Sequence, residues 1–331
     1  MLDMRDEIAR ERFVDTATTA ARKRRAVLDH QSPPPGIARN QSTDTNDTAE
    51  VDGVNYDFAF AARESHHDGS ASTTGFTLVP RPLSSTYWAE PDSNSFRVRG
   101  PTYKDDHLKV NAGCSIARLV AVDIVTVDEP IYTGFSMHPG ERIQLALQKE
   151  KELKRTTKSD LPPFVFVVNI VLPGPPFYHM VYYYAIDDIS TIDGSNGTPS
   201  SQLCQQFFFG ESDEFRDATF KLIPQIIDGH FLVRKAVGST PAIMGKKLRQ
   251  LYVRRQRWME VILDCGSSPV ATGVIRLSVG YAKTLVVDMG FVLQGDAPEV
   301  LPERIFGCVR IKNIVMEGPH IRHVDSMPPV A

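Results

Sequence analysis

Carboxylates gather in one short segment of this sequence, where Asp213, Glu214 and Asp217 surround Arg216. Two carboxyl groups that are held at a fixed distance and have different pKa values can act as general acid and general base. Acids at a helix start give the same pattern, because they favour the positive end of the helix dipole and pair with a nearby arginine. The segment leads directly into the apolar run 220–224. We therefore interpret it as a helix start and assign no catalytic residue.

Two other kinds of chemical site lack the residue spacing that they require. A phosphate-binding loop has four residues between its glycines and continues with Gly-Lys-Ser/Thr. Here six residues separate Gly238 from Gly245, and Lys247 occupies the position of the hydroxyl residue. Zinc needs three or four converging His or Cys ligands, usually from local pairs. The histidines that are close in sequence lie in a polar linker and near the C-terminus, and the four cysteines are far apart. We expect no cofactor and no metal.

A basic segment offers an electrostatic binding surface. Residues 234–257 hold eight Lys/Arg and no acidic residue. Each surface cation near an acidic leaflet contributes about 1 kcal/mol of attraction. The solvated face of a β-hairpin would have the same composition, so that alternative stays open. No nucleic-acid recognition motif accompanies the charge, and we expect no nucleic-acid partner. The candidate lipid headgroup-binding residues are Lys246, Lys247, Arg249, Arg254, Arg255 and Arg257.

Two aromatic triplets offer an apolar surface. They are Tyr182-Tyr-Tyr184 and Phe207-Phe-Phe209. In a strand, successive side chains point to opposite faces, so some of these rings must enter a core while others cover a second surface. Core packing explains such rings, and so does a pocket for an apolar ligand with a few tyrosine hydroxyls. The candidate pocket residues are Tyr182, Tyr184, Phe207 and Phe209.

The elements that would position these groups are mostly strands. Residues 164–172 form the clearest one, and residues 178–186 return after the turn Pro173-Gly-Pro-Pro176. Both strands are apolar on both faces, which predicts a central hairpin in a sheet that is covered on both sides. Further strands are predicted at 117–127, 231–237, 248–252, 259–263, 285–293 and 305–311. Residues 267–283 read as a helix, with Ser267 or Ser268 as its N-cap and Pro269 in its first turn.

Composition divides the chain into three parts. Residues 1–78 form an extension with a predicted helix at 4–30 and a polar linker, 79–318 a domain, and 319–331 a tail. Of the 37 Lys/Arg and 40 Asp/Glu, the extension holds 9 and 13, which leaves 28 against 27. Attraction to an anionic partner must therefore come from a local patch. The predicted fold is α+β, an antiparallel β-sheet packed with a few helices that could enclose an apolar cavity.

Several phrases in the expected order carry a family resemblance. They are Trp88-x-Glu-Pro-Asp92, Phe96-x-Val-Arg-Gly100, Phe215-Arg-Asp217 with Phe220-Lys-Leu-Ile-Pro224, and the block 266–310. Over residues 86–317 the chain resembles the C-terminal domain of the plant "enhanced disease resistance 2" proteins, a domain of unknown activity. In those proteins it follows a pleckstrin-homology domain and a START lipid-binding domain. The resemblance implies a lipid-related setting at a membrane and no established enzyme activity.

We therefore expect a non-enzymatic, lipid-associated binding domain that is cytoplasmic and peripheral to anionic membranes. Its expected partner is an anionic lipid or membrane surface. A protein-interaction module that uses residues 4–30 is the alternative, and an enzyme that combines Asp213 and Asp217 with a histidine is the third. The start of the chain is too charged for a signal peptide, and no segment has the roughly 20 apolar residues of a membrane span.

Overall fold

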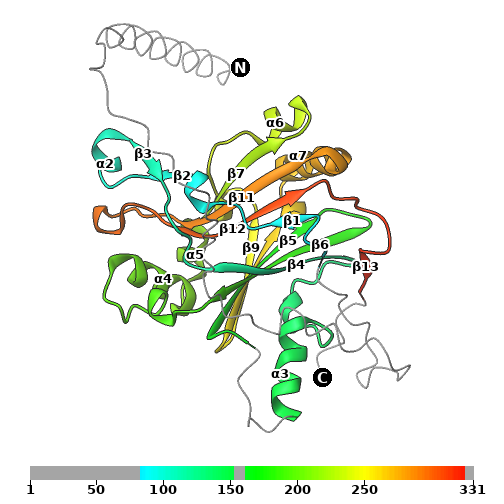
Figure 1. Ribbon diagram of the computed structural model, residues 1–331, viewed down its shortest axis with the longest axis horizontal. Coiled ribbons are helices and arrows are strands. Elements are labelled where there is room, and N and C mark those ends of the chain that lie inside the picture. The colour runs from blue at the N-terminus through cyan, green and yellow to red at the C-terminus, as the bar shows by residue number, and fades with distance from the viewer. Residues whose placement is uncertain (1–82, 153–160, 325–331) are drawn as a thin grey trace, which may run out of the picture. The chain divides into compact units, whose positions relative to one another are not determined.

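Two β-sheets dominate the part of the chain that the computed structural model describes, residues 83–152 and 161–324 (Figure 1). The predicted helix at 4–30 and the polar linker after it lie outside the described residues. The sheets pack face to face around one large apolar core. The fold class is α+β, as predicted, with two sheets in place of one.

The larger sheet has six strands, and the predicted hairpin lies at its centre. All nine residues of β5 are buried, because neighbouring layers cover both faces of the sheet. Most pairs are antiparallel, but β5 with β10 and β4 with β13 are parallel. From edge to edge the strands are β13 (Arg322–His323), β4 (Arg118–Val127), β6 (Phe177–Ile186), β5 (Phe164–Leu172), β10 (Trp258–Asp264) and β9 (Arg249–Arg254). The segment predicted as a tail thus supplies the edge strand β13.

The second sheet has five antiparallel strands. In order they are β1 (Trp88–Ala89), β12 (Ile305–Lys312), β11 (Val286–Leu293), β7 (Phe220–Asp228) and β8 (Ala242–Ile243). A separate hairpin, β2 (Arg97–Arg99) with β3 (Lys109–Asn111), covers the outer face of this sheet through Phe96 and Val98.

Aromatic rings fill the core between the sheets. The ring centroid of Phe166 on β5 lies 5.0 Å from that of Phe306 on β12 and 6.1 Å from that of Phe220 on β7. Both pairs have edge-to-face geometry. Phe207 and Phe208 come from α4 (Pro199–Phe209), a helix that caps one end of this core. Edge-to-face contacts between rings add stability beyond the burial of their area.

On the outer face of the six-stranded sheet, α3 (Arg142–Glu152) packs its apolar side chains against a second cluster. Ile143 and Ala146 contact this cluster, which includes Val165 and Val181. This helix provides the outer cover that the apolar hairpin required.

The helix predicted at 267–283 is present as α7 (Pro269–Gly280). The hydroxyl of Ser268 accepts a hydrogen bond from the amide of Ala271 at 3.4 Å, and Pro269 occupies the first turn. These are the N-cap and proline positions that the sequence predicted. The carboxylate-rich segment also forms a helix, α5 (Asp213–Thr219), with Ser212 as its N-cap.

Two local predictions were wrong. Residues 231–237 form a helix, α6 (Phe231–Val237), although the sequence suggested a strand. The ring of His230 caps its first turn, and Gly238 ends it with a φ of 65°, a conformation that glycine adopts without strain. The triplet 207–209 is likewise helical, in α4, with Thr198 as N-cap. In both segments the caps outweigh the strand preference of Phe and Val.

Candidate functional site

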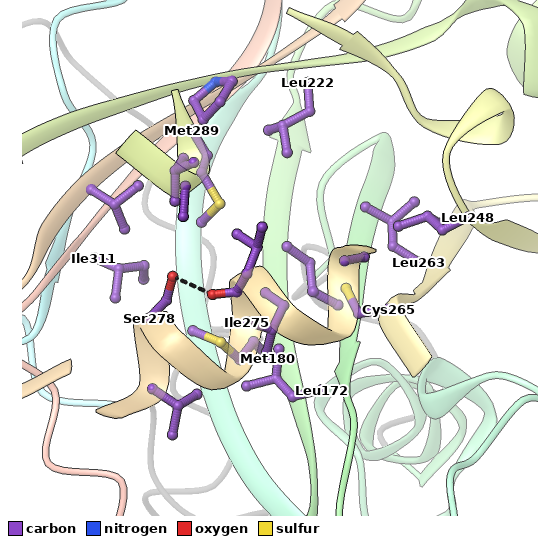
Figure 2. A pocket seen from close by; sticks show the side chains of 18 of the residues that line it. Leu172, Met180, Leu222, Leu248, Leu263, Cys265, Ile275, Ser278, Met289 and Ile311 are labelled. Atoms are coloured by element: carbon purple, nitrogen blue, oxygen red, sulfur yellow. Dashed lines mark hydrogen bonds between the residues drawn. The ribbon is translucent and has the colours of Figure 1, made fainter. Parts of the chain in front are cut away.

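An apolar cavity of about 420 Å³ lies between the two sheets and beneath α7 (Figure 2). The side chains drawn around it belong to both sheets and to the helix. Its walls hold Leu172, Met180 and Leu263 from the six-stranded sheet, and Leu222, Met289 and Ile311 from the five-stranded sheet. Aliphatic side chains surround a hollow here, whereas aromatic rings fill the space between the sheets elsewhere.

Strand and helix periodicity place the lining residues. On β7, Leu222, Pro224 and Ile226 alternate toward the cavity, as every second residue of a strand must. On α7, Ala271, Ile275 and Val279 recur at intervals of four and form one face. No residue of α7 is fully buried, although this face packs against the core. The helix thus covers a hollow rather than a filled interior.

The cavity lining offers few polar atoms. The Ser278 hydroxyl donates to the carbonyl of Val274 at 2.9 Å, the contact that is dashed in Figure 2. The Tyr182 hydroxyl lies 4.0 Å from the sulfur of Met180. Burial raises the pKa of the Cys265 thiol to about 12. These three groups stay neutral near pH 7, and the charged side chain in the lining is that of Lys247. The cavity suits an apolar ligand and gives little support to charged chemistry.

Helix α6 lies beside α7 at the margin of the cavity, to which it contributes Ala236 and Val237. Its first turn points apolar side chains at solvent: Phe231 is 67% exposed and Leu232 41%. The guanidinium of Arg234 donates to the carbonyls of Ile226, Ile227 and Gly229 at 3.1–3.2 Å, which fixes the turn that leads from β7 to α6. These three hydrogen bonds hold the exposed turn of α6 in a defined position.

The aromatic residues predicted to line a pocket are dispersed. Tyr182 lines the cavity. Tyr184 and Phe207 are buried in the aromatic core, and Phe209 is 40% exposed at the end of α4. The residues that sequence reasoning missed are aliphatic ones on β7, β11 and α7. Their signal was the spacing of Ala271, Ile275 and Val279 on the predicted helix, which marks an apolar face without showing a hollow beneath it.

A second hollow, of about 390 Å³, lies against the outer side of β7. We call it the basic cleft and define it by six cations and one carboxylate. They are Arg97, Arg99, Lys109, Lys221, Lys246, Lys247 and Glu303. Arg97 and Arg99 alternate with the buried Phe96 and Val98, and the other charged residues of the cleft come from distant segments.

The predicted headgroup residues separate into two groups. Lys246 and Lys247 enter the basic cleft from the short helix η5 (Met244–Lys246) and the residue after it. The four arginines lie along β9 and the turn to β10. Arg249 pairs with Asp264 at 2.8 Å, Arg254 donates to the carbonyl of Gly210 at 2.7 Å, Arg257 pairs with Glu150 at 2.8 Å, and Arg255 donates to the carbonyl of Arg254 at 2.8 Å.

The carboxylates of α5 have partners nearby. Asp213 pairs with Arg216 at 2.8 Å, and Asp217 accepts hydrogen bonds from Tyr252 at 2.7 Å and Gln250 at 3.0 Å. Within residues 83–152 and 161–324, no group of three His, Cys, Asp or Glu side chains could hold a metal ion. None of the helices in these ranges is long and apolar enough to cross a bilayer.

Comparison with known proteins identifies the family of the domain. Residues 88–315 match the family described as "Protein ENHANCED DISEASE RESISTANCE 2, C-terminal". A relative from Arabidopsis thaliana, "Protein ENHANCED DISEASE RESISTANCE 2-like", is 33% identical over 288 residues, which are 87% of this chain and 35% of that protein. The chain thus spans about a third of that relative's length. No solved structure matches. The chain belongs to the family of enhanced disease resistance 2 C-terminal domains.

Proposed function

We propose that this domain binds a lipid-like ligand in the apolar cavity and exchanges it at a membrane surface. The cavity carries the proposal: about 420 Å³ lies within the range of ligand pockets, and its walls are almost wholly aliphatic. An acyl chain gains about 0.8 kcal/mol for each methylene it moves out of water. Chains of several methylenes can therefore offset the cost of immobilising the ligand.

The exposed turn of α6 supports the membrane part of the proposal. Phe231 and Leu232 present apolar side chains to solvent beside the cavity, and an apolar patch of this kind marks an interaction surface. Lys235 on the same helix is exposed and can meet acidic headgroups. A ligand that leaves the cavity between α6 and α7 would then enter the bilayer without crossing water.

The test is a pair of tryptophan substitutions on α7. Ile275 points into the cavity (Figure 2). The next residue, Arg276, is exposed. Ile275→Trp should fill the cavity and reduce the affinity for a fluorescent long-chain fatty acid at least tenfold. Arg276→Trp should leave it unchanged. Native mass spectrometry of the wild type should show co-purified lipid. A wild type that carries no lipid and does not bind the probe would overturn the proposal.

A further inference from the structure

We propose that the basic cleft binds a phosphate-type anionic group, and that this group is the polar end of the ligand whose apolar part occupies the cavity. The proposal rests on the proposed function, because the cavity must first hold an apolar ligand. The anion could also be a free phosphate ester, since the recognising chemistry is the same. The experiment below separates the two sources.

The charges in the cleft are not balanced. The carboxylate of Glu303 accepts a hydrogen bond from the ammonium group of Lys221. Its Oε1 atom also lies 3.7 Å from the Nε atom of Arg99. Arg99 also reaches Asp296 at 3.2 Å, outside the cleft. By contrast, Lys109, Lys246 and Lys247 form no ion pair with any residue of the described ranges. One lining carboxylate thus faces six cations, which leaves a positive surplus.

Strand register makes this surplus unfavourable without an anion. Arg99 on β2 lies directly opposite Lys109 on β3. Like charges in such a cross-strand pair are destabilising. Arg97 is two residues from Arg99 and therefore lies on the same face of the hairpin. A phosphate between these side chains would replace repulsion with charge-assisted hydrogen bonds, which guanidinium groups make in pairs.

The surplus positive charge also affects Lys221, which is buried at the bottom of the cleft beside Glu303. Lys221 is 5% exposed and Glu303 2%. Burial lowers the pKa of Lys221, the carboxylate of Glu303 offsets part of this effect, and the charges of Arg99 and Lys109 lower the pKa further. An added anion would favour the charged ammonium. A bound anion would therefore add to the ion pair that Lys221 forms with Glu303.

The cleft and the cavity meet at a sheet edge. Along β7, Lys221 and Ile223 face the cleft, whereas Leu222 and Pro224 face the cavity. The neighbouring strand β8 is only two residues long and forms the edge of the sheet. Ala242 on β8 and Lys247 after η5 line both hollows. An amphipathic ligand can therefore cross the edge at Lys247, with its chain on one side and its anionic group on the other.

Two triple variants of the full chain test the inference. Lys109, Lys246 and Lys247 become glutamine in the cleft variant. The control variant replaces three exposed cations elsewhere, as Lys151→Gln, Arg276→Gln and Lys283→Gln, and has the same net charge. The probes are fluorescent diacylglycerol, fluorescent phosphatidic acid with the same chains, and soluble glycerol phosphate. The wild type and the control should bind phosphatidic acid at least tenfold more tightly than diacylglycerol, and the cleft variant should lose that preference.

The outcomes separate the two proposals. If the wild type binds both lipids equally, or if the cleft variant keeps the preference, this inference is wrong while the proposed function stands. If the wild type binds neither lipid, the proposed function fails and this inference fails with it. If glycerol phosphate binds in a manner that requires the three lysines and neither lipid binds, the cleft is an anion site for soluble esters, which overturns its link to the cavity.

Discussion

The Nδ1 atom of His179 on β6 lies 2.9 Å from the Oδ1 atom of Asn169 on β5, and this contact belongs to a chain of buried hydrogen bonds. The Nε2 atom of the same ring accepts from the amide of Ile131 at 3.1 Å. The amide of Asn169 donates to Glu260 at 2.7 Å, and the carboxylate of Glu260 accepts from the backbone of Phe135 and Ser136. This series of hydrogen bonds holds residues 131–136 against the outer face of the six-stranded sheet.

This geometry predicts a loss of stability in acid. The Nε2 atom of His179 must stay unprotonated to accept its bond, and burial lowers the pKa of His179 to about 4 from an ordinary 6.5. The unfolded chain therefore takes up a proton as the pH falls from about 6.5, while the folded chain resists until about 4. Stability present above pH 6.5 should be lost across this window, by about 3 kcal/mol in total.

The measurement is urea unfolding of the wild type and His179→Gln at several pH values between 7 and 4. Burial raises the pKa of the Glu260 carboxyl, an effect of opposite sign that both proteins share. The difference between the two curves therefore isolates the histidine. It should shrink toward low pH, as the wild type loses its advantage. A difference that is constant with pH would contradict the assigned protonation state.

The aromatic core predicts a large cost for one truncation and a small cost for another. Phe166 is fully buried and contacts five other rings, so Phe166→Ala should reduce the free energy of unfolding by about 3–5 kcal/mol. The comparison is the same substitution at Phe209, whose side chain is 40% exposed. Phe209→Ala should cost clearly less, roughly 1 kcal/mol. Chemical denaturation compares them, and equal costs would place β5 outside the core.

Two ion pairs provide a similar contrast. Arg142 and Asp123 are both fully buried and form a two-pronged contact that joins α3 to β4. Asp123→Asn leaves the guanidinium buried without its counter-charge, which should cost about 3–5 kcal/mol. Asp187, half-exposed and 3.6 Å from Arg118, is the control. Asp187→Asn should change stability by less than about 1 kcal/mol. Thermal unfolding of both variants checks the difference.

The sequence was most informative where a signal is local. The hairpin of β5 and β6 follows from unbroken apolar runs and a proline turn, and α7 follows from Ser268 and Pro269. Helix α6 was missed because Phe231 and Val233 favour strands, although Gly238 follows the segment as a helix stop. The carboxylates were correctly interpreted as a helix start, because acids in a first turn favour the helix dipole and pair with a nearby arginine.

The two hollows could not be derived in this way. The basic cleft brings Lys109 to Lys221 and Lys246, which are separated by more than a hundred residues in the sequence and meet only through the packing of β3 beside β7 and η5. The basic segment 234–257 pointed to two of the cleft lysines, Lys246 and Lys247, but its arginines lie on β9 and in the turn to β10. The cavity depends on whether the side chains of both sheets and α7 fill the space between them. Periodicity shows which side chains point inward, but it does not show whether they meet.

The exposed turn of α6 predicts how the protein meets a bilayer. Phe231→Ser with Leu232→Ser removes apolar side chains that are 67% and 41% exposed, so folding should be little affected. Vesicle binding should weaken at least tenfold, because burial of each such side chain contributes about 1.5–3 kcal/mol. The loss should persist at high salt, since apolar burial is not screened as surface charge is.

The matched control changes Leu108 and Ile189, which are also exposed but lie away from α6, to serine. This variant should bind vesicles as the wild type does in a co-sedimentation assay with neutral and acidic vesicles at low and high salt. If both double variants bind equally well, α6 does not enter the bilayer. Binding that vanishes for every protein at high salt would show that charge alone holds the domain on the membrane. In either case the apolar turn beside the cavity would have to serve a different partner, and the route proposed for the ligand between α6 and α7 would lose its support.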